Sequence, residues 1–368
     1  MAIILDDSVL NLPSNSDVRA IIRSRAIVEA VISLPDVAFM PYSTAKSSVL
    51  ALSKKAGPES QGPIFMAEAN EVGRRANGDP LFSEERNEQG DRLLLNDLPG
   101  IAEAYLSYKR TGILDHPNCF VTPASALDDR LDIYYYHPKR FAAEKEIGNS
   151  RWPTPALSEL VAVRRDSVVP SEEMGDSPVR WLGLAEIEEG TGGFEVKVVP
   201  GDKIKSASHS FKGGDILFSK LRPNLRKVVL IPDDDEGGVC SGEILVLRGL
   251  DRLERDGQQL LAGALRLAVD SEYVSFLLRS DLVYGQLMYR VTGVGRPRVS
   301  PEAILTVRMP VPPIQEQKRI VSALKLARAQ SMAARREASV WLARSEEIIR
   351  EAYERVLLEL TANASSRG

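Results

Sequence analysis

The sequence predicts an α/β protein made of two α/β segments and one long C-terminal helix. Short β-branched runs and helical segments alternate over residues 1–55, which is typical of an α/β sheet. From about residue 151 a second series of short strands is separated by turn residues. Between Ile314 and Arg367 the chain has neither Pro nor Gly and is rich in Ala, Leu, Glu, Arg and Lys, which predicts an uninterrupted helix.

The composition excludes several classes of protein. The 368 residues suffice for two or three domains, and a hydrophobic content of 43% excludes disorder over most of the chain. Two cysteines, Cys119 and Cys240, are too few for a disulfide scaffold and lack the spacing of a metal site. The N-terminus lacks the features of a signal peptide, and no stretch approaches the about 20 apolar residues of a membrane span. We therefore expect a cytoplasmic protein that binds no metal and no membrane.

The first segment is expected to contain three strands and two helices. Residues 56–100 are rich in Gly, Asn and acids, so they are expected to be mostly exposed. Residues 111–150 are expected to connect the two segments, with Tyr134–Tyr136 packed at the junction. The expected strands are Ala2–Leu5, Val28–Leu34 and Ser47–Leu52, and the expected helices are Val18–Arg25 and Leu98–Lys109.

The second segment is expected to contain a sheet followed by helices. Turn residues separate its apolar runs, as they do between neighbouring strands. The expected strands are Trp181–Leu184, Ile216–Phe218, Val228–Ile231 and Ile244–Arg248, and the expected helices are Leu260–Ala268 and Ser271–Leu278.

The long helix is expected to begin after Pro312 and Pro313, because proline is favoured at a helix start. If it continued to Leu360 it would be about 70 Å long. Apolar residues recur along its second half at a spacing of seven, which predicts a face that binds a partner helix. The residues of this expected partner-binding face are Leu342, Ile349, Ala352 and Val356.

The basic residues are segregated along the chain, although the formal net charge is only -4. Residues 201–230 carry a net charge of +5, residues 289–308 one of +3, and residues 318–336 one of +6, so the remaining chain carries -18. A charge run is often only a solvated face, and Lys and Arg are good helix formers. In the first two stretches, however, the cations alternate with Gly, Pro, Ser and Asn. Turns of this kind can present cations to DNA phosphates and base edges.

Five stretches stand in a specific order along the chain. They are Arg180-Trp-Leu-Gly-Leu-Ala-Glu-Ile-Glu-Glu-Gly-Thr-Gly, Gly213-Gly-Asp-Ile-Leu-Phe-Ser-Lys-Leu-Arg-Pro-Asn-Leu-Arg-Lys, Val239-Cys-Ser-Gly-Glu-Ile-Leu-Val-Leu-Arg, Thr292-Gly-Val-Gly-Arg-Pro-Arg-Val-Ser-Pro and Pro310-Val-Pro-Pro-Ile-Gln-Glu-Gln-Lys-Arg-Ile-Val. Together they resemble the target recognition domain of a type I restriction–modification specificity subunit. The resemblance implies an α/β domain that reads half of a split DNA site, followed by a helix that docks against methyltransferase subunits or a second helix. The full subunit usually has two such domains, and this chain has one.

Residues 1–140 contain four further matching stretches. They are Ala2-Ile-Ile-Leu-Asp-Asp-Ser-Val-Leu-Asn, Val18-Arg19, Ala30-Val-Ile-Ser-Leu-Pro-Asp-Val-Ala-Phe and Lys46-Ser-Ser-Val-Leu-Ala-Leu. They resemble the C-terminal part of an N6-adenine DNA methyltransferase of the same systems. The catalytic Asn/Asp-Pro-Pro-aromatic motif is absent, since Asn11-Leu-Pro-Ser lacks the second proline and the aromatic that would hold a flipped adenine. The Gly-rich cofactor loop is absent too.

This pattern predicts that the chain is not an enzyme on its own and binds no cofactor. S-adenosylmethionine is expected on a partner methyltransferase. Residues 1–55 of this chain would complete the sheet of that partner. The expected domains are a methyltransferase C-terminal-like segment (1–110), a connector (111–150), a DNA target recognition domain (151–312) and a long helix for subunit docking or dimerisation (313–362).

The leading prediction is sequence-specific binding of double-stranded DNA. The chain would direct an adenine-N6 methyltransferase subunit, and a restriction subunit where one accompanies it, to the target site. The C-terminal helix also permits a homodimer. The alternative is a truncated interaction protein that binds methyltransferase subunits and reads no DNA. The expected DNA contacts are Lys203, Lys205, His209, Lys212, Lys220, Arg222, Asn224, Arg226, Lys227, Arg296 and Arg298, the last two as base readers.

Overall fold

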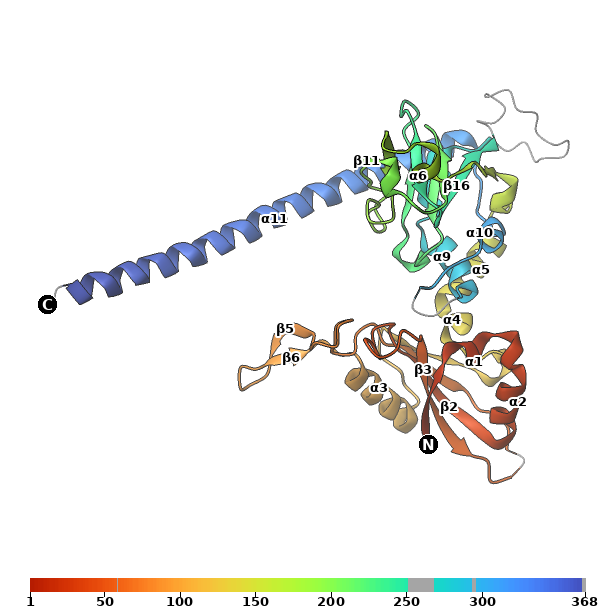
Figure 1. Ribbon diagram of the computed structural model, residues 1–368. Coiled ribbons are helices and arrows are strands. Elements are labelled where there is room, and N and C mark those ends of the chain that lie inside the picture. Colours follow the sequence, from red (N-terminus) through yellow and green to blue (C-terminus); the bar gives the residue numbers. More distant parts are fainter. Residues whose placement is uncertain (58, 251–267, 293–295, 366–368) are drawn as a thin grey trace.

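The computed structural model of the chain describes residues 1–57, 59–250, 268–292 and 296–365. Within these residues it confirms the predicted fold class, with two α/β bodies and a long helix that leaves the second one (Figure 1). We call residues 1–137 the first body and residues 138–312 the second body. The helix expected over residues 260–268 lies outside the described residues, apart from Ala268.

A five-stranded sheet forms the centre of the first body. Three of its strands, β1, β2 and β4, run parallel to one another, whereas β3 and β7 run antiparallel to their neighbours. The three strands predicted for this segment are confirmed. The order across the sheet is β1 (Ala2–Asp6), β3 (Ser47–Lys54), β2 (Ala26–Ser33), β4 (Ile64–Glu68) and β7 (Cys119–Thr122).

Residues 56–100 are mostly exposed, as expected, but strand β4 is an exception. It lies inside the sheet, and its successive side chains Ile64 and Phe65 belong to cores on opposite faces. A strand buried on both faces lacks the alternation of apolar and polar residues, and this run is too short to identify by periodicity. The hairpin β5–β6 does project from the body, as expected (Figure 1). The helices are α1 (Asp7–Asn11), α2 (Ser16–Arg25) and α4 (Ile133–Tyr136) on one face and α3 (Leu98–Thr111) on the other; the hairpin is β5 (Phe82–Arg86) and β6 (Arg92–Leu94).

Residues 111–150 do more than connect the two bodies. Because β7 pairs with β4, the first sheet continues beyond the boundary expected at residue 110. After β7, the helices α4 and α5 (Pro138–Gly148) lead into the second body. Tyr135 packs at the junction with its ring 5.8 Å from that of Tyr289, which confirms the expected packing of the tyrosine cluster.

Two sheets packed face to face form the second body. Leu217 and Val229 of the first sheet share a core with Phe211 and Cys240 of the second. The outer face of the first sheet is covered by the helices α8 (Ser271–Leu277), α9 (Asp281–Leu287) and α10 (Pro301–Leu305). The first sheet has the order β14 (Val228–Leu230), β13 (Ile216–Ser219), β16 (Ile244–Gly249) and β8 (Val161–Val163). The second sheet has the order β11 (Lys197–Pro200), β10 (Pro178–Leu182), β15 (Gly238–Ser241), β12 (Ser208–Phe211) and β9 (Ser167–Val168). The short helix α6 (Pro170–Glu173) follows β9 in the chain.

A buried carboxylate fixes the turn that precedes β13. Asp215 is fully buried. Its Oδ2 accepts from Nε of Arg164 at 3.1 Å and from the backbone N–H of Lys212 at 2.9 Å, and its Oδ1 accepts from Nη1 of Arg248 at 3.0 Å. The carboxylate therefore joins β8, β13 and β16 at one end of their sheet.

A close helix contact joins α5 to the rest of the second body. Gly285 lies in α9 where that helix crosses α5, and a Cβ atom at this position would stand 2.5 Å from the carbonyl oxygen of Lys139 and 2.9 Å from Cβ of Ala143. Only glycine lets the two backbones approach so closely. Since α5 follows the last helix of the first body, this contact helps to set how the two bodies are joined (Figure 1).

We expect Gly285→Ala to destabilise the α5–α9 contact by about 1–3 kcal/mol, because an inserted methyl group must displace packed backbone. The gain in helix propensity, about 1 kcal/mol, offsets part of this loss. Thermal unfolding and limited proteolysis after residue 137 measure the effect. Gly148→Ala is the matched control, since a Cβ at Gly148 would meet nothing within 4 Å; equal effects of the two substitutions would contradict the prediction.

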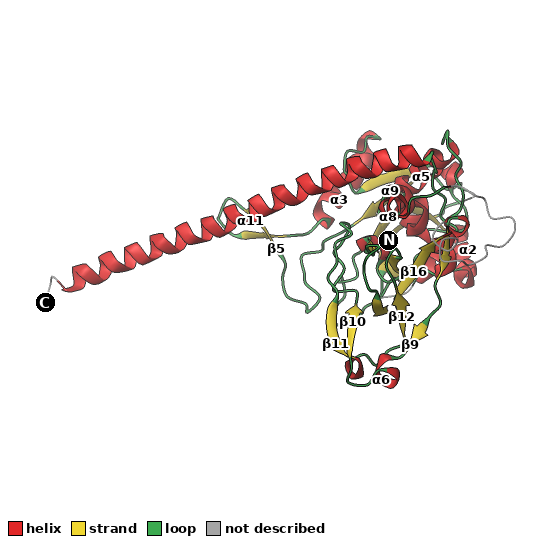
Figure 2. Cartoon of the chain, turned by 90° about the horizontal axis from the view of Figure 1, so that it is seen from above, coloured by secondary structure: helices red, strands yellow, loops and turns green. Residues whose placement is uncertain are grey.

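Helix α11 (Ile314–Ser365) begins directly after Pro312 and Pro313, as predicted, and runs for 52 residues, or about 78 Å. Its first turns pack on α8, and there the buried Gln317 donates to the carbonyl of Ala268 at 2.9 Å and accepts from the N–H of Asp270 at 2.8 Å. The rest of the helix extends away from both bodies (Figures 1 and 2).

The predicted partner-binding face lies on this extended part of α11. Leu342 and Ile349 are 68% and 54% exposed, and the neighbouring Trp341 is 67% exposed. The side chains of Ala352 and Val356 lie outside the described part of the chain. No helix among the described residues is long and apolar enough to cross a membrane.

Candidate nucleic-acid interface

The fold brings the first two basic segments of the sequence together. The backbone N–H of Arg222 donates to the carbonyl of Pro297 at 2.7 Å, and the N–H of Val299 donates to the carbonyl of Lys220 at 3.0 Å. Leu221 and Arg298 form an isolated β-bridge. Residues about 75 positions apart in the sequence therefore lie side by side. We call residues 220–227 and 296–299 together the basic junction.

The turn in the basic junction has an unusual backbone. Arg222 and Arg226 have φ angles of 48° and 51° and flank the short 3₁₀ helix Pro223–Leu225. Among the described residues they are the two non-glycine residues with positive φ. This conformation costs about 1–3 kcal/mol per residue and persists where other contacts fix it, often at functional sites.

Three cations of the basic junction are held by groups of the protein. Arg226 donates to the carbonyl of Arg279 at 3.1 Å, forms an ion pair with Asp281, and lies over the ring of Tyr284. Nζ of Lys220 donates to the carbonyl of Gly242 at 2.7 Å, and Nζ of Lys227 donates to that of Leu184 at 2.9 Å. Their contacts fix the shape of the turn.

Arg298 is paired with an acid that the sequence did not single out. Its Nη2 lies 2.5 Å from Oε1 of Glu243, and its Nε donates to both carboxylate oxygens at 3.1 Å. The hydrogen bonds from Arg298 hold the pKa of Glu243 below its ordinary value. Glu243 lies in the quoted stretch that begins at Val239, yet nothing local links it to an arginine 55 residues away. Glu243 lies beside the basic junction and orients Arg298.

Two arginines of the basic junction, Arg222 and Arg296, have exposed side chains that make no hydrogen bond or ion pair with another described residue, although the charge of Arg296 helps to lower the pKa of Glu243. A guanidinium with free donors can bind a phosphate or the edge of a guanine through two hydrogen bonds. Of the two predicted base readers, Arg296 is thus available for a ligand and Arg298 is engaged with Glu243.

His209 lies next to the basic junction on β12, opposite Cys240 of β15. Burial, followed by the positive charge of Lys220, lowers the pKa of His209. The imidazole is therefore neutral at pH 7. Its Nδ1 is buried and has no partner among the described residues.

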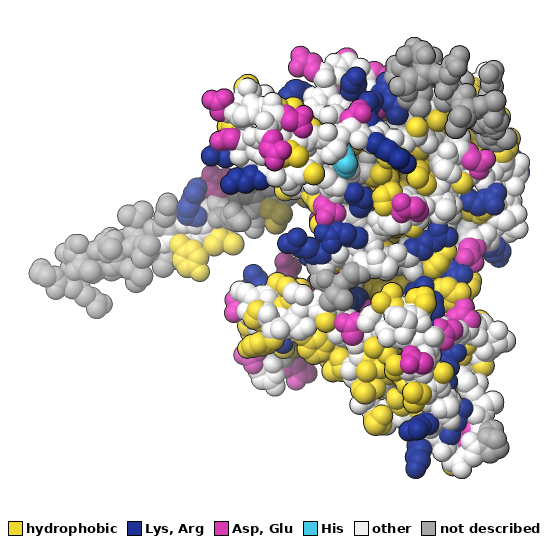
Figure 3. Space-filling model, turned by 45° about the vertical axis from the view of Figure 1, so that its right-hand side comes forward, with side chains coloured by type: hydrophobic (Ala, Val, Ile, Leu, Met, Phe, Trp, Pro, Cys, Tyr) yellow, Lys and Arg dark blue, Asp and Glu magenta, His cyan; other side chains and the backbone are white. Residues whose placement is uncertain are grey.

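The remaining predicted contacts are spread over the second body. Asn224 is exposed on the 3₁₀ helix of the basic junction, and Lys203 and Lys205 are exposed on the segment that leads into β12. Lys212 is exposed at the opposite end of β13 from Lys220, so the fold does not bring it to the basic junction. Figure 3 shows Lys and Arg side chains scattered over the upper body and gathered along the crevice between the two bodies.

Among the residues that the structure describes, no group of three or more His, Cys, Asp or Glu side chains is placed to hold a metal ion. The two free cysteines lie in different bodies, and burial raises the pKa of Cys119 to about 11 and that of Cys240 to about 12. Both thiols are therefore protonated at neutral pH and unsuited to nucleophilic chemistry.

No family model matches the chain. A curated protein, the type I restriction enzyme MjaVIII specificity subunit of Methanocaldococcus jannaschii, is 23% identical over 189 residues, which cover 50% of this chain and 41% of that protein. The chain thus spans less than half the length of this curated relative. The resemblance to specificity subunits that the sequence predicts is confirmed by this similarity.

Two solved structures are also similar. The HsdS subunit from Thermoanaerobacter tengcongensis is 22% identical with a TM-score of 0.41, and the match covers 51% of this chain and 45% of that one. The type IIG restriction endonuclease BpuSI is 10% identical with a TM-score of 0.38, and the match covers 88% of this chain and 42% of that one. The methyltransferase resemblance of residues 1–140 stays a prediction.

Proposed function

We propose that the chain binds a specific sequence in double-stranded DNA, as the specificity component of a type I restriction–modification system. The observation that supports this most is the basic junction, where two cationic segments distant in sequence meet at a strained turn with two arginines free for a ligand. Cations on a rigid, preorganised turn suit the reading of a duplex, in which phosphate contacts supply affinity and arginine contacts to guanine supply specificity.

Within this proposal the residues of the basic junction have different roles. Arg222 and Arg296 contact DNA directly, while Lys220, Arg226 and Lys227 hold the turn and add positive charge to it. Arg298 reads a base edge in the orientation that Glu243 gives it. Lys203, Lys205, His209 and Asn224 extend the contact surface along the backbone of the duplex, and Lys212 contacts it only if the duplex reaches the far end of β13.

The proposed partner is an adenine-N6 methyltransferase subunit, which would carry S-adenosylmethionine and the catalytic motif. Two surfaces suit this docking. Among the described residues β1 pairs only with β3, so its outer edge is free to accept a strand, and Ile3 and Ile4 on it are 38% and 53% exposed. The exposed apolar side chains of α11 suit a helix of that subunit or of a second copy of this chain.

Selection from a random duplex pool, with and without the methyltransferase, tests the proposal. A bound consensus sequence is expected from the chain with its partner, and adding S-adenosylmethionine is expected to methylate that sequence. If the chain binds the methyltransferase but enriches no sequence, the alternative holds, in which it is an interaction protein that reads no DNA. If it binds neither, both readings are wrong.

We expect Lys205→Gln to reduce the salt dependence of DNA binding. The slope of log K against log salt is negative, and its magnitude should decrease by about 1. The preferred sequence should stay the same, because a phosphate contact carries no base information. Fluorescence anisotropy titrations at salt concentrations from about 50 to about 200 mM measure the slope. Lys54→Gln, an exposed lysine of the first body, is the control; a change of sequence preference in Lys205→Gln would contradict the assignment.

A further inference from the structure

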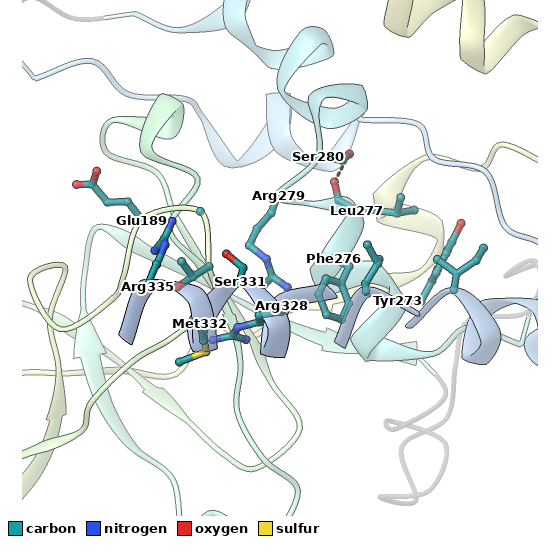
Figure 4. A pocket seen from close by; sticks show the side chains of 14 residues that line it. Glu189, Tyr273, Phe276, Leu277, Arg279, Ser280, Arg328, Ser331, Met332 and Arg335 are labelled. Carbon is teal, nitrogen blue, oxygen red and sulfur yellow. Dashed lines mark hydrogen bonds between the residues drawn. The ribbon is translucent and has the colours of Figure 1, made fainter. Parts of the chain in front are cut away.

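A cavity of about 530 Å³ lies where α11 leaves the second body. Three segments line it, namely α8 with the turn that follows it, the early turns of α11 and the loop around Glu189 (Figure 4). In Figure 4, Glu189 and Arg335 lie at one end of the cavity, Tyr273 lies at the other, and Arg279, from the turn after α8, extends toward Arg328 on α11. None of these residues belongs to the basic junction or to the predicted partner-binding face.

The charge of this cavity is unbalanced. Arg279, Arg328 and Arg335 line it, and Glu189 is the one acid among the lining residues. Nε of Arg328 is buried and has no hydrogen-bond partner among the described residues. A buried donor without a partner destabilises the fold, and more so when it is charged. An anion in the cavity would supply the missing acceptor.

The second arginine strengthens this argument. Nη1 of Arg279 donates to the carbonyl of Val228 and to Oγ of Ser275, both at 2.9 Å, which fixes its guanidinium at the wall of the cavity. Burial and the positive charge of Arg328 together lower the pKa of Arg279 to about 10. Two cations are thus held near each other, and an anion between them would relieve their repulsion.

The rest of the lining is mostly apolar. Phe276, Leu277, Ile320, Leu324 and Met332 form a wall beside the arginines. The volume falls in the range of small-molecule sites, about 300–1,000 Å³, and far exceeds the space that one phosphate group needs. The wall and the cations together suit a ligand with a flat apolar part and an oxyanion.

We propose that this cavity binds a small phosphate-bearing molecule of the nucleotide class. Its phosphate oxygens accept hydrogen bonds from Arg279 and Arg328, and its base lies against the wall of Phe276 and Met332. Because α8, α11 and the loop of Glu189 all contact the ligand, binding ties the root of the long helix to the second body. This inference is independent of DNA reading, since none of the proposed DNA contacts lines the cavity.

Isothermal titration of the full chain with AMP, ATP, adenosine and inorganic phosphate tests the proposal, together with thermal unfolding in each ligand. AMP or ATP is expected to bind more tightly than adenosine or phosphate alone and to raise the unfolding temperature. Arg328→Gln is expected to weaken nucleotide binding about tenfold, the loss of a charge-assisted hydrogen bond. Arg336→Gln, an exposed neighbour outside the lining, should leave it unchanged.

A second variant separates the two parts of the ligand. Met332→Ala, at a position already 40% exposed, should fold normally, weaken AMP binding and leave phosphate binding unchanged. Equal affinity for AMP and inorganic phosphate would overturn the nucleotide assignment. The absence of binding by all four probes, binding that Arg328→Gln does not weaken, or occupation by an acidic peptide but by no nucleotide would overturn the proposed site altogether.

Discussion

Replacing Asp215 with alanine is expected to destabilise the second body by about 3–5 kcal/mol, the range for removing one partner of a buried ion pair. The carboxylate is fully buried and is contacted by the guanidinium groups of Arg164 and Arg248. Its loss removes an acceptor that the two guanidinium groups share, although Arg164 keeps its ion pair with Asp166 and Arg248 keeps its hydrogen bond to the carbonyl of Gly213. It also removes the acceptor for the backbone N–H of Lys212, which shapes the turn before β13.

Urea unfolding followed by the fluorescence of Trp181, which lies in β10 of the same body, measures this effect. Asp234→Ala is the matched control, because Asp234 is exposed on a turn of the same body and its replacement should change stability by no more than about 0.5 kcal/mol. If the two variants unfold at the same urea concentration, Asp215 does not hold the sheet together. Asp215→Asn, which keeps the shape and removes the charge, shows how much of the loss is electrostatic.

The second large effect is expected from Arg296→Ala. If Arg296 reads a base, the free energy of binding to the target duplex should fall by about 1–3 kcal/mol, and the preference at one base position should relax. The reason is geometric: the guanidinium is exposed and makes no hydrogen bond or ion pair with another described residue, and its segment is fixed to the turn through the Arg222–Pro297 hydrogen bond. A loss of this kind needs no change in fold.

Anisotropy titrations with the selected duplex and with single-base variants of it measure this loss. Arg165→Ala removes the same charge from an exposed site of the second body, beside the Arg164–Asp215 pair and not in the basic junction, and should weaken target and random duplexes equally and only slightly. If Arg296→Ala binds target and random duplexes as the parent chain does, Arg296 makes no base contact. Equal weakening on all duplexes would instead assign it to a phosphate.

The local sequence pattern was sufficient to predict those helices and strands whose own residues and flanking turns identify them. The apolar runs that became β2, β3, β13, β14 and β16 lie beside recognisable turns, and the two prolines before Ile314 mark the start of α11. The charge segregation also pointed to the two segments that meet in the basic junction. These features depend on neighbours in the chain, and propensity and periodicity report on such neighbours.

Other features depend on residues far apart in the chain, and they are visible only in the folded structure. Strand β4 is short and buried on both faces, so only its pairing with β2 and β7 identifies it as the interior of a sheet. Glu243 acquires a role only because the fold places it against Arg298, and Gly285 only because α5 crosses α9 there.

The basic residues show the same difference between what the sequence predicts and what the fold adds. The sequence predicts that the chain is α/β, ends in one long helix and concentrates its cations in three stretches. It did not determine which of those cations remain free. Hydrogen bonds engage Lys220, Arg226 and Arg298 with other groups of the protein, whereas the side chains of Arg222 and Arg296 make none among the described residues. These contacts join residues 22 to 55 positions apart in the chain, a separation that no local pattern encodes, so only the packed structure resolves the choice.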